Sequence, residues 1–135
     1  EISLFFLHFG YNTSMKKILS LISFCFFLDA AVEEGSITVN GEMLEVKVST
    51  TYSPQPSYPR SALRRGIEGY VIVEFDVSPD GAVLDPFVVE TDQPGSFERA
   101  ALRSVRRWAF EPYVHEGVPV TVSDVTTTFR FKLAD

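Results

Sequence analysis

Apolar and polar residues alternate with a period of two over residues 67–77, which is the pattern of a β-strand. Four apolar side chains of this stretch share one face: Val71, Val73, Phe75 and Val77. The Ser-Pro-Asp-Gly sequence of residues 78–81 is typical of a turn. Residues 82–91 then predict a return strand, and Pro86 favours a place at the sheet edge because proline donates no ladder hydrogen bond.

The last strand is predicted to begin near Val118 and to run to Leu133, with one irregularity. The apolar positions 118, 120 and 122 have one parity, whereas 125, 129, 131 and 133 have the other. A one-residue slip moves every side chain to the opposite face of a sheet. We therefore expect a β-bulge at Ser123–Asp124.

Helical periodicity appears over residues 96–109, where Ser96 is the predicted N-cap. Spacings of four, four and three place four apolar residues on one face: Phe97, Ala101, Val105 and Trp108. Four arginines cover the other face, where solvent exposure is the default: Arg99, Arg103, Arg106 and Arg107. A shorter helix is predicted to start at Pro59 and to stop at Gly66.

The element order from residue 58 onward is helix, strand, strand, helix, strand. It predicts an α+β fold, a two-layer sandwich in which helices pack on a three-stranded, mainly antiparallel sheet of order 2-1-3. We assign residues 58–135 to this domain and residues 32–57 to a short extension and connector. Within the extension, Asn40-Gly41 favours a type I′ turn and hence a small hairpin, and the three prolines of residues 53–59 favour an extended connector.

The beginning of the chain carries a targeting pattern. Met15-Lys16-Lys17 and the apolar run that follows are typical of a signal peptide over residues 15–31. Residues 1–14 are interpreted as an untranslated leader. Three alternatives stay open for the signal: cleavage near Ala30 or Ala31, retention as an inner-membrane anchor, and a lipoprotein signal with Cys25 as the acylated residue.

Composition and motifs narrow the function classes. The net charge of −6 argues against a nucleic-acid binder, which needs a basic surface to meet phosphates. Glu74 and Asp76 are the nearest approach to a carboxylate pair, and solvated strand residues are the commoner interpretation. His115 has no second ligand near it in the sequence. We therefore expect no enzyme, no cofactor, no metal and no small-molecule substrate.

The predicted sheet leaves the last strand with a free outer edge. This strand has no proline after Val120, and its outward residues are good β-formers or solubilising groups. Such an edge can accept a strand from a partner. The candidate partner-binding residues of the strand are Thr121, Ser123, Val125, Thr126, Thr127, Thr128, Phe129 and Arg130.

The segments YPRSALRRGIEGYVIVEFDVSPDGAV, VVETDQPGSFERAALRSVRRWAFEP and GVPVTV resemble the TonB carboxy-terminal domain family over residues 58–133. The resemblance implies a periplasmic domain of the Gram-negative envelope. Such a domain binds a peptide segment of an outer-membrane transporter through its last strand. It also implies that Tyr58 and Pro59 contact that peptide, beside the plain interpretation of the pair as a helix start.

The chain also departs from the family pattern. Only about 26 residues separate Ala31 from Tyr58, which span at most roughly 90 Å when extended, and the apolar run has no histidine for proton coupling. We therefore expect a partner-binding domain that does not energise transport by itself. The alternative hypothesis is a homodimeric structural or adaptor protein that pairs the same edge with its own copy.

Overall fold

The computed structural model describes residues 31–134. The expectations for the leader, for most of the signal segment and for Cys25 concern residues 1–30 and lie outside the described residues. All of the architecture below belongs to the compact unit that starts at Ala31.

Strands β3 (Gly69–Val77) and β4 (Val83–Thr91) form the antiparallel pair expected from the alternating pattern. The four inward side chains of β3 are each at most 1 % exposed: Val71, Val73, Phe75 and Val77. At the turn between the strands Gly81 has φ +89°, and a Cβ there would lie 2.0 Å from the carbonyl oxygen of Phe110. Only glycine fits this turn without displacing that backbone. β4 lies at one end of the sheet.

Strand β8 (Val122–Phe131) pairs antiparallel with the other side of β3. The register changes between Phe75, opposite Val125, and Val77, opposite Val122, so β8 has one extra residue there. Asp124 at this point has φ +56°. The predicted bulge is confirmed: both Val122 and Val125 are fully buried although their parity differs.

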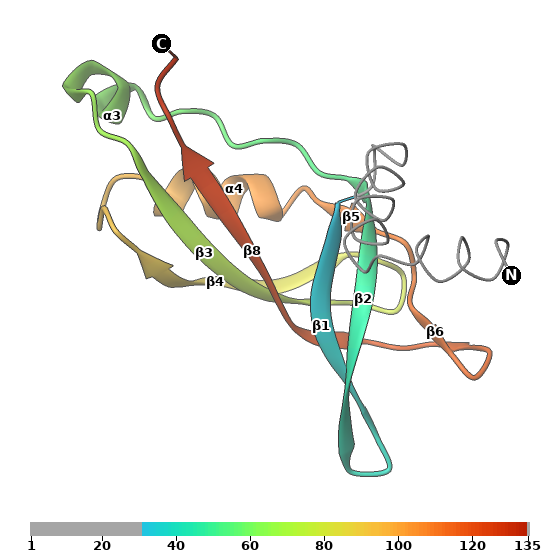
Figure 1. The fold of residues 1–135 in the computed structure, drawn as a ribbon. Coiled ribbons are helices and arrows are strands. Elements are labelled where there is room, and N and C mark those ends of the chain that lie inside the picture. Colours follow the sequence, from blue (N-terminus) through green and yellow to red (C-terminus); the bar gives the residue numbers. More distant parts are fainter. Residues whose placement is uncertain (1–30, 135) are drawn as a thin grey trace, which may run out of the picture. The chain divides into compact units, whose positions relative to one another are not determined.

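The sheet has six strands in the order β4-β3-β8-β1-β2-β5, not the expected three (Figure 1). Strands β1 (Val32–Val39) and β2 (Glu42–Tyr52) form a hairpin in full register. Its turn residues Asn40 and Gly41 have φ +51° and +85°, the positive values that a type I′ turn requires. The expectation of three strands was wrong because the hairpin predicted at Asn40-Gly41 joins this sheet by pairing with β8, a contact between distant parts of the chain that local alternation does not encode. Ile37 and Val48 of the hairpin are buried in the core.

The remaining short strands correct the predicted start of the last strand. Strand β7 (Val118–Pro119) pairs with β6 (Val114–His115) in a separate two-stranded hairpin, and β8 begins only at Val122. Strand β5 (Ala109–Phe110) pairs with the end of β2. The tight turn at Glu116-Gly117, where both residues have positive φ, reverses the chain before it reaches the main sheet.

The helices are shorter than predicted. Helix α3 spans Arg60–Arg65 and ends at Gly66 in the left-handed conformation, as expected. Helix α4 spans Glu98–Val105 rather than residues 96–109. Its N-cap is Phe97, not Ser96, and the Glu98 carboxylate accepts hydrogen bonds from the N–H groups of Gly95 (2.7 Å) and Phe97 (3.1 Å). Its end is early because the chain must turn to form β5.

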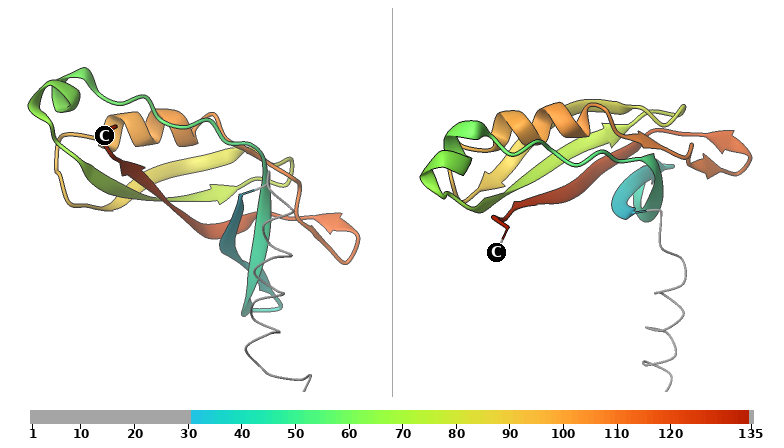
Figure 2. Two further views of the ribbon diagram at one scale, coloured as in Figure 1. Left: turned by 45° about the horizontal axis from the view of Figure 1, so that its top comes forward. Right: turned by 90° about the horizontal axis from the view of Figure 1, so that it is seen from above.

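The helices and the connector form a second layer on one face of the sheet (Figure 2). The apolar face of α4 enters the core as predicted, with Phe97, Ala101, Val105 and Trp108 all buried. Residues 53–59 run along α4, where the Pro54 carbonyl oxygen accepts hydrogen bonds from Ser104 Oγ and from Trp108 Nε1, the latter at 3.0 Å. The connector thus belongs to the layer that covers β8.

Candidate functional site

The direction of the β8 backbone follows from the strand beside it. The N–H of Tyr70 donates to Asp92 Oδ1 at 2.8 Å, and the Tyr70 carbonyl accepts from Thr91 Oγ1 at 2.8 Å, so the backbone groups of Tyr70 face β4. Backbone groups alternate sides along a strand. The odd-numbered residues 69–75 of β3 therefore face β8, and their register partners face β3 in return: Val125, Thr127, Phe129 and Phe131.

The even-numbered residues of β8 have the opposite orientation. The backbone N–H and C=O groups of Thr126, Thr128 and Arg130 point to the outer edge of the sheet. Within residues 31–134, the only strand pairing on this side of β8 is that of Ser36 with Ser123. The carboxyl half of β8 runs away from the hairpin in both Figure 1 and Figure 2. We refer to Thr126, Thr128 and Arg130 as the outer edge.

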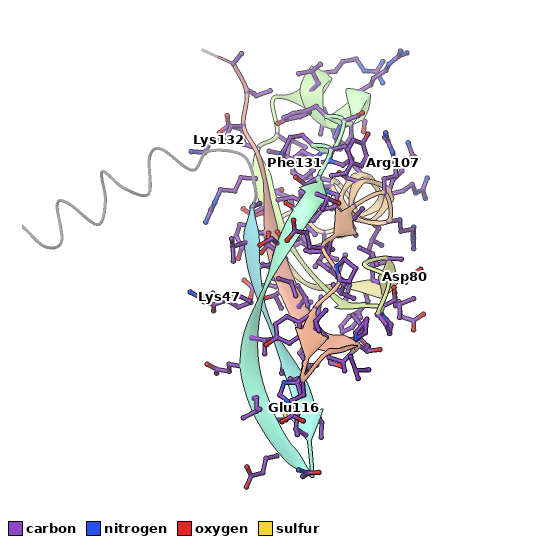
Figure 3. All side chains as sticks on the ribbon, turned by 90° about the vertical axis from the view of Figure 1, so that its right-hand side faces the viewer. Lys47, Asp80, Arg107, Glu116, Phe131 and Lys132 are labelled. Atoms are coloured by element: carbon purple, nitrogen blue, oxygen red, sulfur yellow. The ribbon has the colours of Figure 1, made fainter. Side chains whose placement is uncertain are left out.

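The two faces of this strand differ sharply. The side chains of the outer-edge residues are exposed on the sheet face away from α4. Figure 3 shows the same division at the end of the strand, where Lys132 and Phe131 point to opposite sides. Phe129 and Phe131 are each 3 % exposed, and Phe129 packs against Trp108 with the ring centroids 5.4 Å apart. The outer edge is therefore backed by an aromatic core.

The structure thus separates the candidate residues of the strand into two groups. Val125, Thr127 and Phe129 use their backbone groups to pair with β3, and their side chains are buried. Thr127 Oγ1 donates to Glu33 Oε1 at 3.0 Å. Burial raises the pKa of the Glu33 carboxyl above its ordinary value, and this hydrogen bond opposes the rise. These three residues hold β8 in place and do not offer their backbone groups to a partner.

The amino end of the strand is already covered. Ser123 pairs with Ser36 of β1, and Ser36 Oγ donates to Asp124 Oδ2 at 3.1 Å. Thr121 is exposed and precedes β8. The sequence alone did not predict the pairing of Ser36 with Ser123. The one signal for it is Gly35, because a glycine inside a strand marks close approach of another backbone: a Cβ there would lie 2.6 Å from Val122 Cγ1.

Tyr58 and Pro59 lie on the helix side of the sheet. The Tyr58 ring makes edge-to-face contacts with Phe97 (5.6 Å between centroids) and with Phe131 (5.8 Å), and its hydroxyl donates to the Ile67 carbonyl. Pro59 is the N-cap of α3. Tyr58 therefore fastens the connector to the end of β8, a structural contact that exists whether or not a peptide touches the pair.

A groove of about 790 Å³ lies beside Pro59, between α3 and α4. Four arginines and one carboxylate line it: Arg60, Arg99, Arg103, Arg106 and Glu98. The groove is the hollowed part of the arginine face that the periodicity predicted. A second groove, of about 470 Å³, lies between β1, β2 and the start of β8.

The described part of the chain shows no cluster of three or more His, Cys, Asp or Glu side chains able to hold a metal ion. None of the helices in residues 31–134 has the length and apolar character needed to cross a membrane. The candidate site is the outer edge of β8, and the chemistry it offers is backbone hydrogen bonding.

Comparison with known proteins finds a matching family and similar relatives. The family described as Gram-negative bacterial TonB protein C-terminal matches residues 54–133. The chain is 34 % identical to Protein TonB of Vibrio cholerae over 79 residues, which cover 58 % of this chain and 32 % of that protein. It is 40 % identical to Protein TonB of Klebsiella pneumoniae over 79 residues, covering 58 % and 30 % respectively. The chain thus spans about a third of the length of these relatives.

Two solved structures are similar over most of their own length. The solution NMR structure of the Pseudomonas aeruginosa TonB CTD superposes with a TM-score of 0.57 at 35 % identity, covering 65 % of this chain and 88 % of that one. The TonB2 protein of Vibrio anguillarum superposes with a TM-score of 0.51 at 33 % identity, covering 63 % and 80 %. The family match begins after the β1–β2 hairpin, so the hairpin lies outside the matched residues.

Proposed function

Since the chain belongs to the TonB carboxy-terminal domain family, we propose that it binds an extended segment of an outer-membrane transporter by β-strand addition. The guest segment pairs with the outer edge of β8 in the periplasm, and the binding contributes to TonB-dependent transport. The observation that carries the proposal is the outward orientation of the backbone groups of Thr126, Thr128 and Arg130 on a strand that is buried on its other side.

The energetics of such pairing favour recognition of a backbone rather than of one sequence. Each outer-edge residue offers one donor and one acceptor, and each hydrogen bond formed contributes roughly 0.5–1.5 kcal/mol net. The strand is preorganised because β3 and the aromatic core hold it before the guest arrives. The guest alone therefore bears the loss of conformational entropy on pairing.

The proposal concerns the partner-binding step. The chain covers 32 % of the Vibrio cholerae relative and 30 % of the Klebsiella pneumoniae relative. Energy coupling is not part of the proposal.

The test compares two proline substitutions on adjacent residues of β8. Thr128→Pro removes an outward N–H, so it should reduce guest affinity by about tenfold or more while the domain stays folded. Thr127→Pro removes an N–H that pairs with β3, so it should lower the stability of the domain instead. The probe is an array of overlapping 12-residue peptides from the periplasmic segments of the host's outer-membrane transporters. Affinity is measured by titration calorimetry and folding by circular dichroism.

Three results would contradict the proposal. They are binding by no peptide of the array, unchanged affinity of Thr128→Pro, and equal loss of folding in both variants. Proline at a neighbouring residue makes the comparison sharp, because the two variants lose N–H groups that point in opposite directions. Thr127→Pro also removes a buried side chain and its hydrogen bond to Glu33, which adds to the expected loss of stability.

Self-association through the same edge is the second candidate, and the same outward groups favour it. Two copies of β8 in antiparallel contact would form a closed, two-fold dimer. Sedimentation at low micromolar concentration distinguishes the two candidates: a tight dimer without peptide binding supports the adaptor role, and a monomer that binds peptide supports the transporter role.

A further inference from the structure

The backbone of the β1–β2 hairpin pairs with the candidate binding strand at one end, and farther along that strand the Glu33 carboxylate accepts a hydrogen bond from Thr127 Oγ1. Gly35 and Ser36 of β1 lie against the start of β8, where Ser36 pairs with Ser123. A side chain at Gly35 would collide with Val122 Cγ1 at 2.6 Å and with Val125 Cγ2 at 2.7 Å, so this close approach requires glycine. The edge of β8 is therefore covered from Val122 to Val125 by a segment of the same chain.

Beyond the bulge the hairpin and β8 diverge, and the groove of about 470 Å³ opens between them. Thr126, the first outer-edge residue, is part of its lining. The side chain of Thr126 points to the sheet face away from α4, where it is exposed. In a paired strand, the residue directly opposite has its Cβ about 4.5–5.5 Å away on the same face. The guest residue opposite Thr126 would therefore extend its side chain into this groove.

The charges of the groove are unequal. Three carboxylates line it, Glu34, Glu45 and Asp124, against a single lysine, Lys47. Met43 and Val46 contribute apolar surface to the same lining. A long basic side chain suits this combination, because its methylene groups cover apolar surface while its charged end meets carboxylates.

We propose that the β1–β2 hairpin is a stop for the guest strand: it ends pairing at Thr126 and favours lysine or arginine at the guest residue opposite Thr126. This inference rests on the proposed strand addition and deepens it. The hairpin fixes the register because a guest that continued past Thr126 would meet β1 at Ser123. The other end of the edge, toward Lys132, stays open, so the guest can extend in that direction.

The first experiment measures affinity as a function of peptide length. The probe is the tightest transporter peptide of the array, shortened and extended at each end, and NMR contacts to the Thr126 amide identify the residue opposite it. In the unaltered chain, residues added beyond that position toward the hairpin should change affinity by less than about twofold. In Gly35→Val the side chain displaces β1. Each added hydrogen bond should then raise affinity by about 2- to 10-fold.

Thr38→Val is the matched control, because it places the same side chain at an exposed position of β1 that lies away from β8. It should respond to peptide length as the unaltered chain does. An affinity that rises past Thr126 in the unaltered chain overturns the stop, and so does an identical length response in Gly35→Val. In either case the short peptide still binds, so the proposed function survives. Absence of binding at every length overturns both.

The second experiment tests the charge preference and does not disturb the hairpin. The peptide carries either lysine or glutamate opposite Thr126, and the preference for lysine should be about fivefold at low salt and smaller at high salt. Glu45→Lys, a change at an exposed residue, should abolish or reverse it. Equal affinity of the two peptides, or a lysine preference that Glu45→Lys leaves unchanged, overturns the assigned charge preference.

Discussion

Glu33 shows at the scale of a single residue how the hairpin is attached to β8. Its half-buried carboxylate accepts a hydrogen bond from Thr127 Oγ1, and desolvation raises its pKa above the ordinary 4.5. The folded state therefore binds this proton more tightly than the unfolded chain does. Stability from this group is greatest below pH 4.5 and falls as the pH rises through the folded pKa.

Glu33→Gln should remove this loss, because an amide oxygen can accept the same hydrogen bond without a desolvated charge. We expect the melting temperature near pH 7 to rise by about 1–2 °C, a small change because solvent screens the partly exposed group. The fall in melting temperature between pH 4.5 and 7 should become smaller by about 1–2 °C as well. Thermal melts between pH 4 and 8 measure both effects. Glu34→Gln, at the exposed neighbour, is the control, and an equal effect there would contradict the assignment.

The connector is the element whose role the sequence understated. Its three prolines predict extended chain, yet the Pro54 carbonyl joins it to α4 through two donors, Ser104 Oγ and Trp108 Nε1. Tyr58 fastens its other end to Phe97 and Phe131. The connector thus packs on the inner face of the sheet and supports the end of β8 at Phe131.

A double-mutant cycle at Pro54 should detect this attachment. Ser104→Ala should cost about 1 kcal/mol of unfolding free energy, since the Trp108 donor remains. Trp108→Phe should cost about 2 kcal/mol, because it loses a donor and core volume. The double variant should exceed the sum by about 1 kcal/mol, because the carbonyl then has neither donor. Urea denaturation measures all three. Ser61→Ala in α3 is the exposed control, and simple additivity would show that the two donors act independently.

At the scale of the whole molecule, the sheet has a stable central part formed by β4, β3 and β8, and a less stable extension formed by the β1–β2 hairpin. β3 pairs with β8 and with β4 over most of its length, and all of its inward side chains are buried. The hairpin joins β8 through one backbone pair, Ser36 with Ser123, and through side-chain hydrogen bonds of Glu33 and Ser36. It contributes two buried apolar side chains, Ile37 and Val48. Local opening free energies follow buried contact.

Hydrogen exchange should therefore resolve two levels of protection. Amides of Val71, Val73, Thr127 and Phe129 should exchange only through global unfolding. Amides of β1 should exchange at a lower free energy, when the hairpin leaves β8. The outward amides of Thr126 and Thr128 should exchange fastest within β8 and become protected when a peptide binds. Native-state exchange followed by NMR measures these rates, and uniform protection across β1 and β8 would contradict the division.

Much of this protein follows from local pattern alone. The sequence alone predicts the alternation in β3, the apolar face of α4, the turn at Gly81, the end of α3 at Gly66 and the bulge at Asp124. Each depends on the period of a strand or helix, or on a backbone conformation that few residues adopt. The family resemblance came from the same residues.

Tertiary structure decided which strands share the sheet and which backbone groups face outward. The pairing of β1 with β8 requires Gly35 to approach Val122 across 87 residues of chain, and no local period encodes such a contact. The orientation of Thr126, Thr128 and Arg130 became known only from the register of β8 against β3. Local sequence determines the elements because their energies are local, whereas the open edge depends on how far the hairpin covers it.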